Sequence, residues 1–188
     1  PAIPGITDHL SGLTGADWKM ALADLEDLLL INKPAPSMPP IAPNRLLDCH
    51  PLIREYFAQQ IKEQHPSAWQ AAHQRLYEYY KGVARELPDT LAEMEPLYRA
   101  LVHGCKAGLY QEASDDVYWK RIRRGTESYS LKKLGAYSSG LAAIAGLFVT
   151  PWRMMEGELR EGSRAFLLNE AGLCLRALGR LREAIEPT

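Results

Sequence analysis

Histidine and cysteine are the side chains of this 188-residue chain best suited to bind a metal ion, and they come together at two places. Cys49 directly precedes His50, and His103 stands two residues before Cys105. Zinc sites in proteins use characteristic short spacings between their ligands. Neither of these two pairs has such a spacing. We therefore predict no metal site, and interpret these residues as buried thiols and helix-capping histidines.

The motifs that carry catalysis or phosphate binding are missing from the sequence. It has no Gly-x-x-x-x-Gly-Lys-Ser/Thr phosphate loop, no Gly-x-Gly-x-x-Gly turn, no His-Glu-x-x-His pair and no Gly-x-Ser-x-Gly elbow. Acidic pairs such as Glu93 with Glu95 and Asp115 with Asp116 fall in charge-rich helical stretches, where solvated faces are expected. We predict no catalytic residues, and no cofactor held by this chain alone.

The densest charge in the chain is the basic run Lys120–Arg124, which Trp119 precedes. Near a helix C-terminus such cations complement the helix dipole, and an anionic or acidic partner is the functional alternative. Trp119 either packs in the core or stacks on a ligand. Of the three tyrosines between positions 77 and 80, only part can be buried. The candidates for partner binding are therefore Tyr79, Trp119, Arg121 and Arg124.

Composition places the chain among ordinary globular proteins, with 46% hydrophobic residues and a formal net charge of −1. That charge argues against a general nucleic-acid or membrane-surface binder. Three cysteines, odd in number and far apart, indicate reduced thiols and a cytoplasmic location. The uncharged stretch Leu134–Trp152 is interrupted by glycine and proline, so we interpret it as a buried helix rather than a membrane span.

The elements that position His50 can be predicted from its neighbours. A short extended segment, Leu46–Cys49, leads into His50, and Pro51 then occupies the first position of a helix that runs to Gln64. Proline suits this position because its missing N–H has no partner there. Apolar residues recur along one side of this helix, which predicts an amphipathic face.

The segment before His50 completes a small mixed module. Residues from Asp17 to Leu29 have amphipathic helical spacing. Five prolines between Asn32 and Pro43 predict an irregular loop. Leu30–Ile31 and Leu46–Leu47 can pair as a small β-hairpin around that loop. Helix, hairpin and helix together predict a partial winged-helix domain over residues 1–64.

Residues 65–188 are predicted to be helical almost throughout. Short helices with small residues at the turns are typical of stacked antiparallel hairpins. The predicted helices cover Ser67 to about Leu87, Asp89 or Thr90 to about Gly108, Tyr110–Ile122, Ser130–Phe148, Ser163–Leu178, and a fragment from Arg180 onward.

Two stretches of this helical part resemble each other. In Ala107–Ala113 and Leu178–Ala184 a glycine is followed by an apolar residue two positions later and an alanine three positions after that. The second stretch, with the preceding Leu168–Gly172, resembles the tetratricopeptide (TPR) pattern, in which Gly179 would turn the chain. We therefore predict TPR-like hairpins forming a right-handed superhelix over 65–188, truncated in the last repeat.

The stretch Leu47–Phe57, with its Asp-Cys-His-Pro-Leu-Ile-Arg-Glu-Tyr-Phe wording, resembles the winged-helix segment of STAND signalling ATPases, the group that includes NB-ARC and NACHT proteins. The resemblance extends to the helices that follow, which are similar to the linker and TPR-like superhelix of bacterial members. It implies that this chain is the C-terminal part of such a regulator, without its ATPase domain. ADP or ATP would bind only in the parent protein.

The resemblance also implies a role for His50, since the matching histidine of the family senses the bound nucleotide. Here Pro51 replaces the aspartate that often follows the histidine in plant and animal members. The alternative, from the residues themselves, is that His50 bonds the local backbone at the helix start.

Three functions are compatible with these features. The first is a non-catalytic relay that binds a protein or peptide ligand in its helical groove and signals to an upstream nucleotide-binding domain. The second is a free-standing TPR-like scaffold for partner peptides. The third, a winged-helix DNA-binding regulator, is disfavoured because the helix at Asp17–Leu29 has four acidic residues against Lys19.

Overall fold

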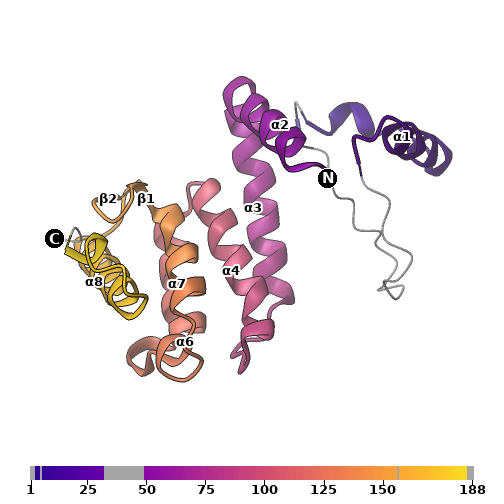
Figure 1. Ribbon diagram of the computed structural model, residues 1–188. Coiled ribbons are helices and arrows are strands. Elements are labelled where there is room, and N and C mark those ends of the chain that lie inside the picture. Colours follow the sequence, from indigo (N-terminus) through magenta and orange to yellow (C-terminus); the bar gives the residue numbers. More distant parts are fainter. Residues whose placement is uncertain (1–2, 5, 32–48, 156, 186–188) are drawn as a thin grey trace. The chain divides into compact units, whose positions relative to one another are not determined.

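The computed structural model describes residues 3–4, 6–31, 49–155 and 157–185 (Figure 1). Within these ranges the chain is mainly helical, as predicted, with one small antiparallel pair of strands. Its contacts divide it into two compact units, Pro1–Trp69 and Gln70–Thr188. The division falls inside helix α3 (Pro66–Val83), close to the predicted boundary between residues 64 and 65. The winged-helix, TPR-like and superhelical arrangements stay predictions.

The helices of the first unit begin at well-formed local caps. The unit contains a short 3₁₀ turn, η1 (Asp8–Leu10), then α1 (Gly15–Asp27) and α2 (Pro51–Gln64). At α1, Thr14 and Asp17 form a capping box, in which each side chain accepts a hydrogen bond from the other's backbone N–H. At α2, Pro51 occupies the first helical position, as the sequence predicts.

Neither α1 nor α2 has a buried side chain. Large apolar residues of both helices are exposed, for example Met20 of α1 at 64% and Leu52 of α2 at 67%. Among the described residues, those classed as buried begin only at Ala68. Amphipathic spacing therefore identified these two helices correctly, but within the described residues neither helix contributes a buried side chain to a core.

One predicted strand of the winged-helix hairpin is not formed. Leu30 and Ile31 lie in a bend rather than a strand, directly after Leu29, which has a positive φ of 57°. Their predicted partners, Leu46 and Leu47, and the proline-rich loop lie outside the described residues. The two strands that the structure does describe are elsewhere, in the second unit.

The second unit is built around a layer of neighbouring helices. In Figure 1, α3, α4 (Leu91–Lys106) and α7 (Tyr137–Ile144) lie side by side. Between α4 and α7 come α5 (Tyr110–Glu112), η2 (Ala113–Arg123), η3 (Gly125–Glu127) and α6 (Tyr129–Lys132). Of these, η2 is a π-helix, and its wider turn is visible where the N–H of Arg124 reaches the carbonyl of Trp119, five residues back.

The predicted single helix Ser130–Phe148 is wrong. The chain turns at Gly135, which has a φ of +62° and so adopts a left-handed conformation that suits glycine. The Ala136 N–H then bonds back to the Ser130 carbonyl, which closes the end of α6. After α7 and a 3₁₀ turn, η4 (Ala145–Leu147), the backbone becomes extended at Phe148.

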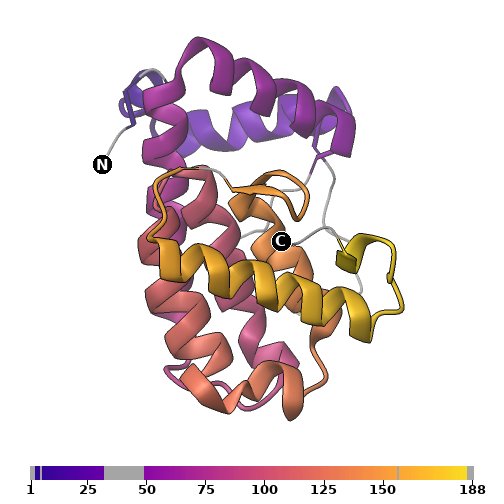
Figure 2. The same cartoon turned by 90° about the vertical axis from the view of Figure 1, so that its left-hand side faces the viewer.

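The last part of the unit crosses the earlier helices. Strands β1 (Phe148–Thr150) and β2 (Met154–Met155) form an antiparallel hairpin in which Phe148 pairs with Met155. Helix α8 (Glu161–Ala177) and the 3₁₀ turn η5 (Glu183–Ile185) follow. Figure 2 shows α8 running across α4 and α7 rather than alongside them.

The core of the second unit is one cluster of buried residues contributed by α3, α4, η2, α6, α7, the hairpin and α8. Its largest fully buried members include Tyr77, Tyr118, Met94 and Leu167. Gly104 on α4 allows a close approach to α3 and η2, because a Cβ at this position would lie 2.8 Å from Ala113 and 3.0 Å from the Tyr77 ring. A single continuous core is typical of one folding unit.

The two similar stretches of sequence fold into the same helix ending. After α4, Gly108 has a φ of +79°, its N–H bonds to Cys105, and the N–H of Leu109 bonds to Gly104. After α8, Gly179 has a φ of +74°, its N–H bonds to Arg176, and the N–H of Arg180 bonds to Leu175. Both are Schellman endings, so the predicted turn at Gly179 is confirmed.

Candidate partner-binding site

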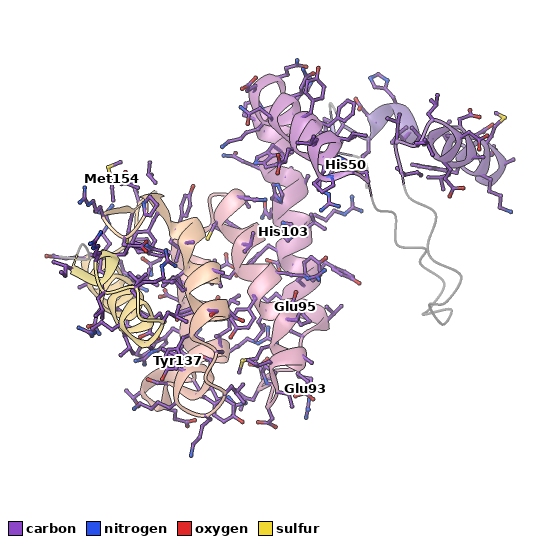
Figure 3. All side chains as sticks on the ribbon, viewed as in Figure 1. His50, Glu93, Glu95, His103, Tyr137 and Met154 are labelled. Carbon is purple, nitrogen blue, oxygen red and sulfur yellow. The ribbon has the colours of Figure 1, made fainter. Side chains whose placement is uncertain are left out.

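His50 lies at the start of α2 and bonds the local backbone (Figure 3). Its Nδ1 accepts a hydrogen bond from the N–H of Leu52 at 3.3 Å, and the side chain is exposed. This geometry corresponds to the helix-capping interpretation. The nucleotide-sensing role of His50 requires the parent protein and stays a prediction.

Arg121 is buried, although the sequence suggested a partner-binding cation. Its guanidinium donates four hydrogen bonds to backbone carbonyls at the C-terminal end of α3, those of Lys81, Ala84, Arg85 and Glu86, at 2.8–3.3 Å. The last carbonyls of a helix have no partner within the helix, and a nearby cation favours that negative end. Arg121 therefore stabilises the end of α3 and has little surface with which to contact a partner.

Arg124 acts on the next part of the same connection. Its guanidinium donates to the carbonyl of Pro88 at 2.6 Å and to the Asp89 carboxylate at 3.0 Å, and it stacks on the Tyr129 ring at 3.6 Å. The hydrogen bond from Arg124 lowers the pKa of the Asp89 carboxyl below its usual value. The structure thus brings Arg121 and Arg124 together on the link between α3 and α4, where both are engaged inside the protein.

Tyr79 is exposed, at 57%, while Tyr77 on the same helix is fully buried. The Tyr79 ring meets the edge of Tyr80 at 5.3 Å between centroids. The exposure fits a partner contact, but the structure gives Tyr79 and Trp119 different neighbours. They are not brought together as one site by any contact that the structure describes.

Trp119 borders an open cavity of about 250 Å³ between η2 and the first turn of α8. The Trp119 ring meets the Phe166 ring edge to face, with centroids 4.9 Å apart and planes at 88°. The remaining lining comes from small and polar residues: Ser114, Asp115, Gly162 and Ser163. Trp119 is 37% exposed, so it is available to a ligand.

A polar network centred on Gln111 joins two residues of the cavity lining, Asp115 and Ser163. The Gln111 amide N–H groups donate to the Asp115 carboxylate at 2.9 Å and to the Ser163 hydroxyl at 3.0 Å. Its carbonyl oxygen accepts the backbone N–H of Arg160 at 2.8 Å. The Arg160 guanidinium also donates to Asp115. The one carboxylate of the cavity is therefore already matched by donors.

The two aromatic walls are held by a buried ion pair. The guanidinium of Arg123 lies 5.0 Å from the Trp119 ring centroid and 4.9 Å from that of Phe166. Its Nε donates to the Glu170 carboxylate at 3.0 Å, and the same oxygen accepts from the Tyr118 hydroxyl at 3.2 Å. Glu170 is fully buried, and its other oxygen has no hydrogen-bond partner among the described residues.

A second polar cluster joins α3 to α4. The Nδ1 atoms of His73 and His103 are 2.8 Å apart, and their ring planes differ by 24°. One ring must donate and the other accept, so at least one imidazole of the pair is neutral. Burial lowers the pKa of His73 to about 4, and burial also lowers the pKa of His103. Figure 3 shows His103 on α4.

Sequence reasoning found Trp119 but missed Arg123, Phe166 and Glu170, which complete its surroundings. Glu170 has the sequence signature of a surface residue, and no motif marks its burial. In the part of the chain that the structure describes, no group of three or more His, Cys, Asp or Glu side chains is placed to hold a metal ion. None of the helices in the described ranges is long and apolar enough to cross a bilayer.

Comparison with known proteins gives this chain no relative. No protein-family model, no curated protein and no solved structure matches it.

Proposed function

We propose that this chain is a non-catalytic module that binds a protein or peptide partner, and that it serves as the relay portion of a STAND-type regulatory ATPase. The observation that carries the binding role is the cavity beside Trp119, where a partly exposed aromatic pair borders open space on a well-packed helical unit. Tryptophan and arginine are the residues most often responsible for affinity at protein interfaces.

The charged side chains of the second unit support a binding rather than a catalytic role. Arg121, Arg124 and the Arg123–Glu170 pair are each committed to contacts within the protein. These groups position helices and aromatic rings instead of converging on a reaction centre. The proposal therefore includes no catalysis by this chain and no nucleotide bound to it alone.

The relay role rests on the resemblance around His50 and on the sharp helix start at Pro51. A relay needs a ligand that favours one of two domain arrangements, so that binding in one place changes an equilibrium elsewhere. In the parent protein, the partner would bind the helical unit and the winged-helix segment would communicate with the nucleotide-binding domain.

A selection from a random peptide library against the immobilised chain tests the binding role. We expect enriched peptides that bind with micromolar dissociation constants, and no heat of binding when ADP is titrated into this chain. Failure to enrich any peptide above an unselected control would contradict the proposal. The relay role is tested by adding a selected peptide to the parent protein and measuring ATP turnover. The proposal predicts that the peptide changes the rate of turnover.

Binding of duplex DNA is the outcome that would favour a different function. The proposal predicts no salt-dependent shift of a DNA duplex at micromolar protein. Helix α1 contains four acidic residues, Asp17, Asp24, Glu26 and Asp27. Phosphate groups would be repelled by that surface.

A further inference from the structure

Resting on the proposed function, we infer that the cavity between η2 and α8 receives one large uncharged side chain, aromatic or aliphatic, from a partner peptide. We name it the Trp119 pocket, lined by Ser114, Asp115, Trp119, Gly162, Ser163 and Phe166.

The size of the Trp119 pocket favours a single side chain over a small-molecule ligand. Its volume is about 250 Å³, below the range of roughly 300–1,000 Å³ that is usual for sites of drug-sized ligands and cofactors. A cavity of this size, open on one side, suits an anchoring side chain whose backbone stays outside. Anchors of this kind supply most of the affinity of many peptide interfaces.

The electrostatics of the Trp119 pocket disfavour a charged occupant. Asp115 is the one ionisable residue of the lining, and both of its oxygens already accept hydrogen bonds, from Gln111 and Arg160. A cationic ligand would therefore have to compete with the Gln111 and Arg160 donors for that carboxylate. It would also meet Arg123, whose guanidinium is already stacked on both aromatic rings. An anionic ligand would have to displace the Asp115 network and lie beside that carboxylate.

The walls of the pocket are fixed before any ligand arrives. Arg123 is held by the buried Glu170, and its guanidinium lies over both rings. The Gln111 network ties the start of α8 to η2. A ligand that enters such a site does not have to order its walls, and this reduces the entropic cost of binding.

Gly162 provides a way to fill the pocket without disturbing the core. A Cβ added at Gly162 would have no atom within 4 Å, so Gly162→Leu places a side chain in open space beside the cavity. Gly82 on α3 is a matched control, because it is also exposed and also has no atom within 4 Å of an added Cβ. Thermal unfolding of both variants checks that the fold is kept.

Titration of the full chain with three probes tests the inference by NMR, using the indole N–H of Trp119 and the amides of Gly162 and Ser163. The probes are N-acetyl-tryptophan amide, N-acetyl-leucine amide and Nα-acetyl-lysine amide. We expect the first two to shift these signals with dissociation constants on the order of 1–10 mM, and the lysine probe to bind at least tenfold more weakly. Gly162→Leu should abolish the shifts, whereas Gly82→Leu should leave them unchanged.

Other outcomes would overturn either the inference or the proposed function, and they tell the two apart. The inference that the pocket receives an uncharged side chain would be contradicted if the signals still shift in Gly162→Leu. It would also be contradicted if the lysine probe binds more tightly than the other two. If the chain self-associates and Gly162→Leu abolishes this association, the pocket is occupied by a second copy of the chain. If library peptides bind the chain equally well before and after Gly162→Leu, the proposed function stands and the Trp119 pocket is not its site. If no library peptide binds although the two probes do, the function fails and the pocket remains.

Discussion

The helices of residues 1–69 and those of residues 70–188 have similar amphipathic patterns but different support. Helices α1 and α2 bury no side chain, and each begins at a side-chain cap. Helix α4 buries seven of its residues and α8 six, and buried polar groups tie these helices to their neighbours. Periodicity therefore specifies helices in both units. Among the described residues, the helices of the second unit are also stabilised by buried long-range contacts.

The largest effect should follow from Arg121→Met, which removes four hydrogen bonds to the end of α3. We expect the free energy of unfolding of the second unit to fall by about 3–5 kcal/mol, because four carbonyls lose a charged donor at once. Chemical denaturation followed by circular dichroism measures the loss. Arg99→Met is the control, since Arg99 is more than half exposed in its pair with Glu95. The control should change stability by no more than about 1 kcal/mol. Equal effects of the two variants would contradict the role of Arg121 in stabilising the end of α3.

The Arg123–Glu170 pair should behave as a coupled unit. Glu170→Leu alone leaves the largely buried Arg123 without its carboxylate, and we expect a loss of about 3 kcal/mol. Adding Arg123→Met removes the unpaired charge, so the double variant should recover at least about 1 kcal/mol of that loss. A double-mutant cycle by urea denaturation gives the coupling. Additive losses would show that the pair contributes nothing as a pair.

Acid should weaken the second unit through the His73–His103 pair. Burial and the nearby charges of Lys106 and Arg99 lower the pKa of His103, and burial, with His103 and Lys106, lowers the pKa of His73 to about 4. Below about pH 6.5 the unfolded chain takes up protons that the folded pair does not. Stability should therefore fall, by about 1–3 kcal/mol, as the pH falls from 6.5 towards 4.

Thermal unfolding between pH 7 and 4 measures this dependence. The double variant His73→Phe/His103→Phe should flatten the pH profile, whatever its stability at pH 7. His65 is exposed, so His65→Gln should leave the profile unchanged. A profile that keeps its slope without the pair would assign the dependence to other groups.

The smallest effect on stability is expected from removing a threonine cap, and each unit has one such cap to compare. Thr14 caps α1 and Thr90 caps α4, and each accepts the backbone N–H three residues later. Thr90→Ala should lower the unfolding free energy of the second unit by about 1 kcal/mol. Thr14→Ala should reduce the protection of α1 amides against hydrogen exchange. It should leave the unfolding midpoint of the second unit unchanged. A shift of that midpoint by Thr14→Ala would mean that the two units unfold together.

Local signals in the sequence predicted most of the helices, because each depends on residues next to it. The helix Pro51–Gln64 was predicted with its observed bounds, and the turn at Gly179 follows from one glycine. The break at Gly135 was missed because the surrounding residues have helical spacing. The bend at Leu30–Ile31 was missed because short apolar pairs do not distinguish a strand from a bend.

The site was harder to predict because its polar residues are buried. Arg121 and Glu170 look like surface residues in the sequence, and only three-dimensional contacts show that one clamps α3 and the other anchors Arg123. Trp119 was identified from its type and its basic neighbours. Its partner Phe166 lies 47 positions further along the chain on α8, and no local pattern connects them.

Native-state hydrogen exchange of the full chain, resolved by residue, tests the difference between the two units most directly. The account predicts that amides of α4 and α8 exchange through global unfolding, on the order of a thousandfold or more slower than those of α1 and α2, which open locally. Equal and strong protection of α1 and α2 would contradict it, because helices without buried side chains would then be as stable as the packed ones.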